Sequence, residues 1–163
     1  MKTMHSQQGS MIIEALIALI LFSFGMLGLI GLQAAAINTN VDTGYRVEAN
    51  NFANRMFGQM QGNLRRDSVA NYVADAQSYD HQSTGGDNNC EFSGADSANA
   101  DVIAWLDDLQ NAAKASRLPQ ASAQIRVTAS TAVGAINTVR IVVCWQQPGL
   151  SVPRRHVLMG TLT

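Results

Sequence analysis

The sequence is short of charge, proline and cysteine. Charged residues make up 14% of its 163 residues, where a soluble domain carries roughly a quarter, and the three prolines all lie at or after Pro119. The 11 Lys+Arg and 12 Asp+Glu leave a net charge of -1, which argues against a strongly basic nucleic-acid binder and an acidic disordered chain. No repeat with a period of 20–50 residues is present, which argues against a solenoid. The length fits one ordinary domain.

Sequence motifs of catalysis are also missing. The chain has no G-x-S-x-G, Walker loop, H-E-x-x-H or dinucleotide fingerprint, and the stretch 87–89 lacks the spacing of a calcium loop. The absence of motifs does not by itself exclude catalysis, but we expect no enzymatic activity, no cofactor and no small-molecule substrate. A membrane-anchored enzyme or solute-binding protein stays open as an alternative, and it would require a concave site with convergent polar groups.

The missing charge is concentrated near the N-terminus. Between Glu14 and Asp42 lie 27 residues without a charge, and those from Ala15 to Leu32 read ALIALILFSFGMLGLIGL. As a helix, the segment from Met11 to Leu32 would measure about 33 Å, enough to cross a hydrocarbon core of ~30 Å. The alternative is a cleaved secretory signal with its cleavage site at 34–36. The apolar run is too long for one, and an acid lies at its leading edge.

The Glu14 carboxylate needs a partner, because an unpaired charge in hydrocarbon costs several kcal/mol. No Lys, Arg or His occurs between His5 and Arg46. The partner must therefore be something other than a nearby side chain, such as a new chain terminus or another subunit.

The stretch Gly9-Ser10-Met11-Ile12-Ile13-Glu14, followed by the apolar segment, resembles the N-terminal signal of type IV pilins and the related pseudopilins. The resemblance implies that a prepilin peptidase cuts after Gly9 and methylates the new amino terminus at Ser10, where the family usually has Phe. Glu14 would then pair with the amine of Ser10, most naturally that of a neighbouring subunit.

The predicted orientation follows from the leader, in which Lys2 and His5 favour the cytoplasmic side and place the rest of the chain in the periplasm. We expect four segments: a leader (1–9), a transmembrane and filament-core helix (10–32), an amphipathic continuation of that helix (33–65) and a periplasmic head (66–163).

Helical periodicity continues beyond Leu32 to about Arg65. The apolar positions that step by three or four are Val41, Tyr45, Ala49, Phe52, Met56, Met60 and Leu64. The predicted helix is about 56 residues and roughly 84 Å long, and its second half must bury an apolar stripe. A coiled-coil stalk is an alternative, but the sustained charged flanks of a heptad seam are absent.

The remaining sequence predicts an α+β head. Residues 76–96 are rich in Ser, Gly, Asn and Asp and indicate an irregular surface excursion. A helix capped by Ser97 or Asn99 should run to about Ser116, with Lys114 and Arg117 near its end and an apolar face of Val102, Trp105, Leu106, Leu109 and Ala113.

Three antiparallel strands should follow, over 124–129, 139–145 and 154–162, with turns near Gly134 and at Gln147-Pro148-Gly149. The long N-terminal helix packed on this small sheet is also the architecture of pilins. A Trp-containing helix followed by a strand ending in Val-Cys-Trp is similar to the minor pilin group called PilV.

The two cysteines, Cys90 and Cys144, are predicted to form a disulfide, because an even number in an oxidising compartment favours pairing. The competing hypothesis is a zinc site that His81 or His156 would complete, without a recognisable ligand spacing. We expect no metal.

Taken together, the resemblance implies a minor pilin that helps to initiate assembly of a type IV pilus. Such a subunit is expected at the pilus tip, and it would contribute to twitching motility, adhesion or DNA uptake. Its partners would be the prepilin peptidase, the inner membrane and other minor and major pilins. The nearest alternative is a minor pseudopilin of a type II secretion system. Arg65-Arg66 and Arg154-Arg155 are the only candidates for DNA contacts, and two pairs on a net-negative chain favour solvated surfaces instead.

Overall fold

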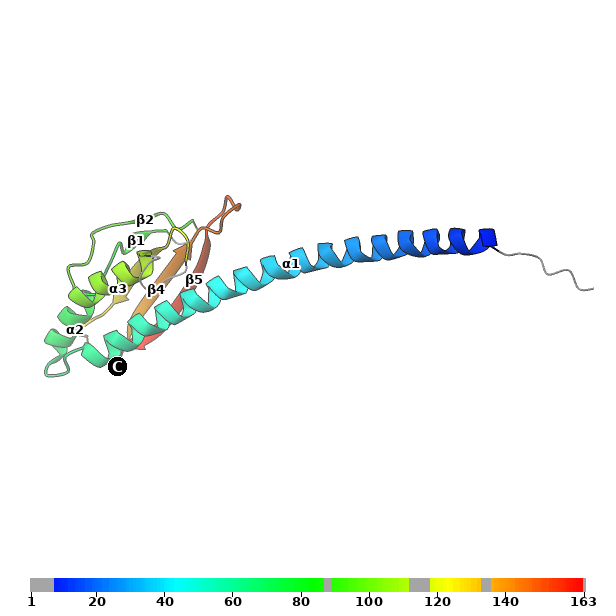
Figure 1. The fold of residues 1–163 in the computed structure, drawn as a ribbon. Helices are drawn as coiled ribbons and strands as arrows, with labels where there is room; N and C mark the ends of the chain where they lie inside the picture. Colours follow the sequence, from blue (N-terminus) through cyan, green and yellow to red (C-terminus); the bar gives the residue numbers. More distant parts are fainter. Residues whose placement is uncertain (1–7, 87–88, 112–117, 133–135, 163) are drawn as a thin grey trace, which may run out of the picture. The chain divides into compact units, whose positions relative to one another are not determined.

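The computed structural model describes residues 8–86, 89–111, 118–132 and 136–162. The chain forms two compact units, Met1–Val41 and Asp42–Thr163. Helix α1 (Gln8–Asn63) runs through both units (Figure 1). Its bounds lie within two residues of those predicted from the periodicity.

The first unit contains the apolar part of α1. Leu, Ala and Met are strong helix formers, and no proline interrupts the segment. The hydroxyl of Ser23 donates a hydrogen bond to the carbonyl of Leu19 at 2.8 Å, so the one polar side chain between Ala15 and Leu32 is satisfied within the helix. The segment therefore presents apolar side chains on all sides.

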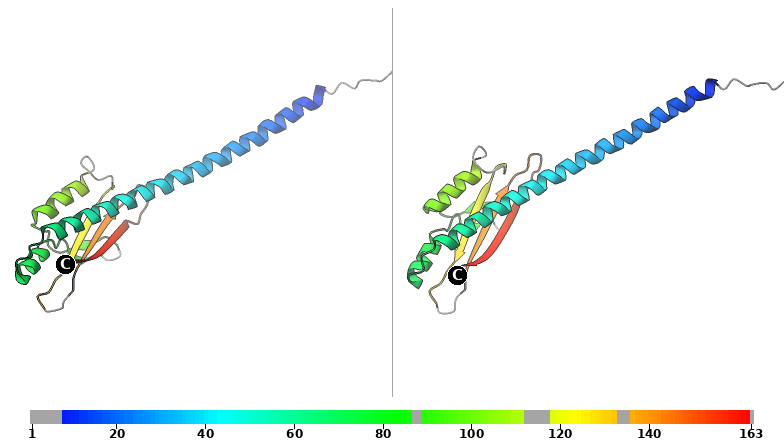
Figure 2. Two further views of the ribbon diagram at one scale, coloured as in Figure 1. Left: turned by 90° about the horizontal axis from the view of Figure 1, so that it is seen from below. Right: turned by 60° about the horizontal axis from the view of Figure 1, so that its bottom comes forward.

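In the second unit α1 becomes amphipathic. The predicted stripe is confirmed from Ala49 onward, with Val41 exposed at its start and Tyr45 only half-buried. The fully buried side chains are those of Ala49, Phe52, Met56 and Met60, followed by Leu64 just beyond the end of the helix. Figure 2 shows this part of α1 lying across the strands of the sheet.

A short helix that the sequence analysis did not predict follows. Helix α2 (Val69–Gln77) begins at Ser68, whose hydroxyl accepts a hydrogen bond from the backbone N–H of Asn71. Its buried face consists of Tyr72, Val73 and Ala76. Ala76 follows Tyr72 by four residues and Val73 by three, which is the apolar spacing typical of a helix.

The predicted excursion of residues 76–96 is largely irregular, as expected, but it carries a small hairpin. Strands β1 (Thr84–Gly85) and β2 (Phe92–Ser93) pair antiparallel within it. Tyr79 and His81 in the same segment are buried, so the excursion is part of the packed head.

Helix α3 (Ala100–Gln110) begins where it was predicted. The side chain of Asn99 caps it by accepting from the N–H of Asp101 at 2.9 Å, and Val102, Trp105 and Leu109 are buried. The helix ends at Gln110 because Asn111 adopts extended backbone. The predicted extension to Ser116, with Lys114 and Arg117, falls outside the described residues.

The three predicted strands form one antiparallel sheet in the order β3–β4–β5. The strands are β3 (Ser122–Thr128), β4 (Asn137–Trp145) and β5 (Arg154–Leu162), with Ile125, Ile141 and Leu158 in register. The turn before β5 is also as predicted, since Gly149 has φ 84° and Leu150 donates to the carbonyl of Gln147. The predicted turn at Gly134 lies outside the described residues.

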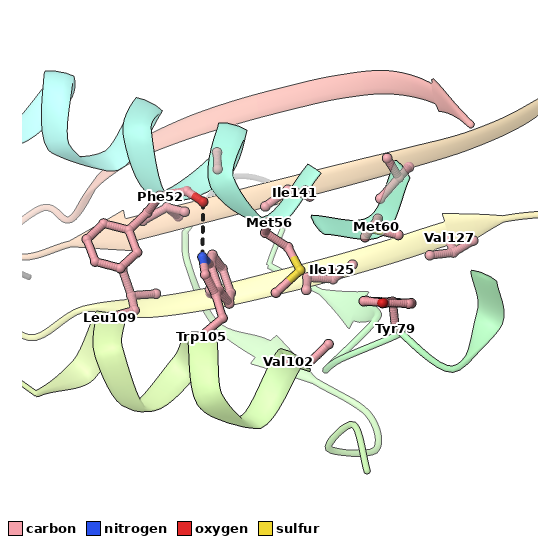
Figure 3. Close-up of a cluster of buried hydrophobic side chains, with 14 of the residues drawn as sticks. Phe52, Met56, Met60, Tyr79, Val102, Trp105, Leu109, Ile125, Val127 and Ile141 are labelled. Atoms are coloured by element: carbon pink, nitrogen blue, oxygen red, sulfur yellow. Dashed lines mark hydrogen bonds between the residues drawn. The ribbon is translucent and has the colours of Figure 1, made fainter. Parts of the chain in front are cut away.

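The core lies between α1, α3 and one face of the sheet, here called the inner face (Figure 3). Side chains alternate along strands, so Ile125 and Ile141 point to the inner face and Gln124 and Val142 to the opposite, outer face. The indole N–H of Trp105 donates to the carbonyl of Phe52 at 3.0 Å, which joins α3 to α1. The α+β fold class predicted from the sequence is confirmed.

α1 lies close to β5 at Gly160. A Cβ at this position would lie 2.5 Å from ring atoms of Phe57, whereas a Cβ on Gly58, the next residue of α1, would meet nothing within 4 Å. We expect Gly160→Ala to lower the free energy of unfolding by about 1–2 kcal/mol through overpacking. Gly58→Ala should instead raise it by up to about 1 kcal/mol through helix propensity.

Urea titration of the full chain in detergent micelles checks this prediction, with the fluorescence of Trp105 and Trp145 as the probe, because both lie in the head. The cost of Gly160→Ala should shrink in a Phe57→Ala background. Equal effects of Gly160→Ala and Gly58→Ala would show that the contact with Phe57 does not limit packing.

Candidate functional site

The apolar part of α1 is the first candidate functional region. Residues Met11–Gln33 have a mean hydropathy of 2.5, and none of that segment is buried within the protein. At ~1.5 Å per residue the helix measures about 34 Å, which matches a hydrocarbon core of ~30 Å. Among the described residues, this helix is long and apolar enough to span a membrane. Its composition is consistent with either a membrane anchor or a signal sequence.

The residues of the predicted processing site lie at the start of this helix. Gly9 and Ser10 belong to its first turn, and Glu14, which is exposed, follows Ser10 by four residues, or about one turn. Residues 8–41, the described part of this unit, include no Lys, Arg or His, so no cationic side chain among them can pair with Glu14. The roles assigned to Gly9, Ser10 and Glu14 stay predictions.

The second predicted pair, Cys90 and Cys144, is joined by a disulfide. The bond connects the excursion to the outer face of β4 across 54 positions in the sequence. Cys90 has φ 62°, a left-handed conformation that costs a residue with a Cβ about 1–2 kcal/mol. Because both sulfur atoms are bonded to each other, they are not available as the thiolate ligands that the zinc hypothesis needed.

A buried glutamine lies beneath the excursion and was not singled out from the sequence. The side chain of Gln124 is fully buried on the outer face of the sheet, although glutamine is a polar residue. Its amide NH₂ donates to three carbonyls of the excursion, those of Gln82, Thr84 and Gly85, at 2.7, 3.2 and 3.1 Å. Its oxygen accepts from Arg140 at 3.2 Å. Gln124 therefore holds the excursion against the sheet.

His81 attaches the same excursion to the edge of β3. Its backbone N–H and carbonyl both pair with Ile125 at 3.0 Å, and the Asp80 carboxylate accepts from the N–H of Val127 at 2.6 Å. The ring is 5% exposed, and its Nδ1 accepts from the N–H of Ser97, which fixes the neutral ring with its proton on Nε2. Burial lowers the pKa of His81, and the nearby Asp96 carboxylate opposes this shift.

A cluster of hydrogen-bonded polar side chains lies at the C-terminal end of α1. The Asp101 carboxylate accepts from the hydroxyl of Tyr79 at 2.9 Å and from the amide of Asn63 at 2.7 Å. Burial, together with the hydrogen bond to Asp101, raises the pKa of Tyr79 to about 12. The guanidinium of Arg66 donates to the carbonyls of Gln61 and Leu64, which caps the end of α1. The backbone N–H of Arg65 donates to the Asp75 carboxylate at 3.0 Å, and the Arg65 guanidinium lies 3.8 Å from the same carboxylate. Both arginines of this pair, one of the two considered for DNA, therefore make contacts within the head.

A hollow of about 820 Å³ adjoins the C-terminal half of β5. Arg126 and Arg140 line it together with the hydroxyls of Thr128, Thr138 and Thr161. The described residues that line it include hydrogen-bond donors but no Asp, Glu, His or Cys. The hollow is therefore basic in character.

The described geometry combines a long apolar N-terminal helix with a three-stranded antiparallel sheet in a head that a disulfide closes. The architecture is pilin-like. Comparisons with protein-family profiles, with curated proteins and with solved structures give no match. The disulfide also indicates that the head of this pilin-like protein folds outside the cytoplasm.

Removal of the disulfide should destabilise the pilin-like head. Closure of a loop of this length contributes about 4 kcal/mol in the chain-entropy model, so Cys90→Ser combined with Cys144→Ala should lower the free energy of unfolding by roughly that amount. Urea unfolding of the full chain in micelles measures it. Reductant should destabilise the wild type and leave the variant unchanged, whereas a variant within about 1 kcal/mol of the oxidised wild type would contradict the prediction.

His81 should make the stability of the head depend on pH. Since burial lowers the pKa of His81 below its ordinary 6.5, the unfolded chain binds a proton at a higher pH than the folded head does. The stability that neutral His81 contributes to the head is fully present above pH 6.5, and it is lost as the pH falls from 6.5 through the lowered pKa of the folded state.

We expect the free energy of unfolding to decrease more between pH 7.5 and about 5 for the wild type than for His81→Asn. The amide oxygen of the new side chain can still accept from Ser97, and it does not titrate in this range. His156→Asn serves as the matched variant, because burial also lowers the pKa of His156, which lies on β5 rather than in the excursion. Superimposable pH profiles of wild type and His81→Asn would disprove the role of His81.

Proposed function

We propose that the protein is a minor pilin of a type IV pilus, of the PilV type, which helps to initiate pilus assembly. The supporting observation is the stretch Gly9-Ser10-Met11-Ile12-Ile13-Glu14 at the start of an unbroken apolar helix that continues into a disulfide-closed αβ head. In this proposal the chain is anchored in the inner membrane with its head in the periplasm, and it then moves to the pilus tip.

Assembly depends in this proposal on the charge of Glu14. Cleavage after Gly9 by a prepilin peptidase creates an amine at Ser10, which supplies the cation that residues 8–41 lack. A carboxylate and an amine about 4 Å apart attract each other by ~1 kcal/mol in water but ~4 kcal/mol at an effective dielectric constant of 20. A neighbouring subunit that offers this amine would therefore draw Glu14 out of the bilayer and set the axial register.

The head has a different role from the apolar helix. Its polar network and disulfide keep a fixed surface, while the apolar helix supplies a generic packing element for the filament core. Other minor and major pilins would be the partners of this surface. The proposal requires no bound cofactor and no chemistry at the head.

Glu14→Ala should impair incorporation into filaments by about tenfold or more, since the neighbouring amine would be left without its partner. The matched control is Ser23→Ala. Ser23 is the polar residue of the apolar run from Ala15 to Leu32, and its hydroxyl donates to the carbonyl of Leu19 in the same helix. Immunoblots of sheared pili and of membranes, from a strain that lacks the chromosomal copy, measure incorporation and membrane insertion separately.

Intact-mass analysis of the membrane fraction accompanies this test. Both variants and the wild type should begin at Ser10 with one added methyl group, and their heads should be equally stable. A mature chain that begins after Ala36, or wild-type incorporation of Glu14→Ala, would refute the mechanism. Normal piliation with a loss of protein export in the deletion strain would instead identify a pseudopilin of a type II secretion system.

A further inference from the structure

The two edge strands of the sheet, β3 and β5, differ in whether another segment pairs with their outer side. The edge of β3 is covered, because His81 pairs with Ile125 through two backbone hydrogen bonds and Asp80 accepts from Val127. β5 pairs with β4 on one side and, among the described residues, has no strand on the other. A long edge strand presents unpaired N–H and C=O groups, to which another extended chain can pair.

α1 contacts the C-terminal end of this edge. The amide of Gln61 donates to the carbonyl of Thr161 at 3.4 Å, and Phe57 contacts Gly160. The stretch from Arg154 to Met159, here called the β5 edge, lies before these contacts. It spans six residues, which is the length of an ordinary paired strand.

The side chains of the β5 edge on the outer face are those of Arg155, Val157 and Met159, since this set is in register with Cys144, Val142 and Arg140 of β4. Val157 is 36% exposed and Met159 75% exposed. Two aliphatic side chains on alternate positions of an open strand would gain burial from aliphatic neighbours on an added strand.

The charge of the sheet indicates which charge a partner strand should carry. All 12 acidic residues lie at or before Asp108, so the three-stranded sheet carries arginine and no carboxylate. Arg154 and Arg155 begin the β5 edge, and Arg126 and Arg140 line the hollow beside Met159 at its other end. Acidic side chains on an added strand would be favoured at both ends, and basic ones disfavoured.

We propose that the β5 edge is a docking site for an extended, acidic segment of another protein, which adds to the sheet as a further strand. Main-chain hydrogen bonds to β5 would provide affinity. Aliphatic side chains beside Val157 and Met159, together with acidic side chains near the arginines, would provide selectivity.

The test uses the full chain in detergent micelles and the heptapeptide ETVTVTE, whose pattern reads the same in both directions and so fits either strand orientation. KTVTVTK is the charge control, and ETVPVTE is the backbone control because proline cannot donate to a ladder. Amide hydrogen exchange of β5 should slow about tenfold at alternate residues of 154–159 when ETVTVTE binds, and this alternation is specific to strand pairing.

ETVTVTE should bind at least about fivefold more tightly than either control. Met159→Lys should weaken its binding about two- to fivefold, whereas Ile103→Lys on α3, which replaces an aliphatic side chain that is 53% exposed, should not. Tryptophan fluorescence verifies that both variants are folded.

Three outcomes would overturn the proposal: equal binding of ETVTVTE and KTVTVTK, equal binding of ETVPVTE, or protection that does not alternate along β5. A fourth would assign the edge to a second copy of the chain, namely a dimer by sedimentation whose β5 amides are protected without peptide. None of these outcomes depends on whether the protein assembles into a pilus.

Discussion

The head depends on burial of one stripe of α1 against the inner face of the sheet. Phe52, Met56 and Met60 are buried there, and each large apolar side chain contributes about 1.5–3 kcal/mol when fully removed from water. The same helix is apolar on all sides from Met11 to Leu32, and none of that segment is buried within the protein. The single helix α1 therefore contains an apolar segment that suits a hydrocarbon environment and an amphipathic segment on which the head packs.

The outer face of the sheet is covered by different means. Val142 and Cys144 are buried there under an excursion that contains only two short strands and few large apolar side chains. Such a segment cannot hold its position by hydrophobic burial alone, because fixing each backbone residue costs roughly 1–2 kcal/mol. The disulfide, the three carbonyls held by Gln124 and the two hydrogen bonds of His81 supply the remaining stabilisation.

These two coverings leave one part of the sheet accessible. The excursion protects the edge of β3, while the basic edge of β5 remains open up to the contacts made by Gln61 and Phe57. In the proposed assembly the N-terminal helix supplies a generic packing element, and the head would need a second surface with its own selectivity. An edge with backbone groups, two aliphatic side chains and charge of one sign meets that requirement.

The sequence by itself determined the elements whose signals are local: the apolar helix, the stripe from Ala49 to Leu64, the start of α3 at Asn99 and the three strands. Periodicity, caps and turn residues specify these features within a few residues of chain. It also indicated the pairing of Cys90 with Cys144, since no other cysteine is available. Helix α2 was missed although Ser68 and the spacing of Tyr72 and Ala76 indicate it, because a nine-residue helix has a weak signal. Only the tertiary structure decided that Gln124 is buried, that His81 pairs with the edge of β3 and that no strand in the described part of the chain pairs with the outer edge of β5. Each of these depends on which distant segment lies against a strand, and strand alternation reports only which side chains share a face.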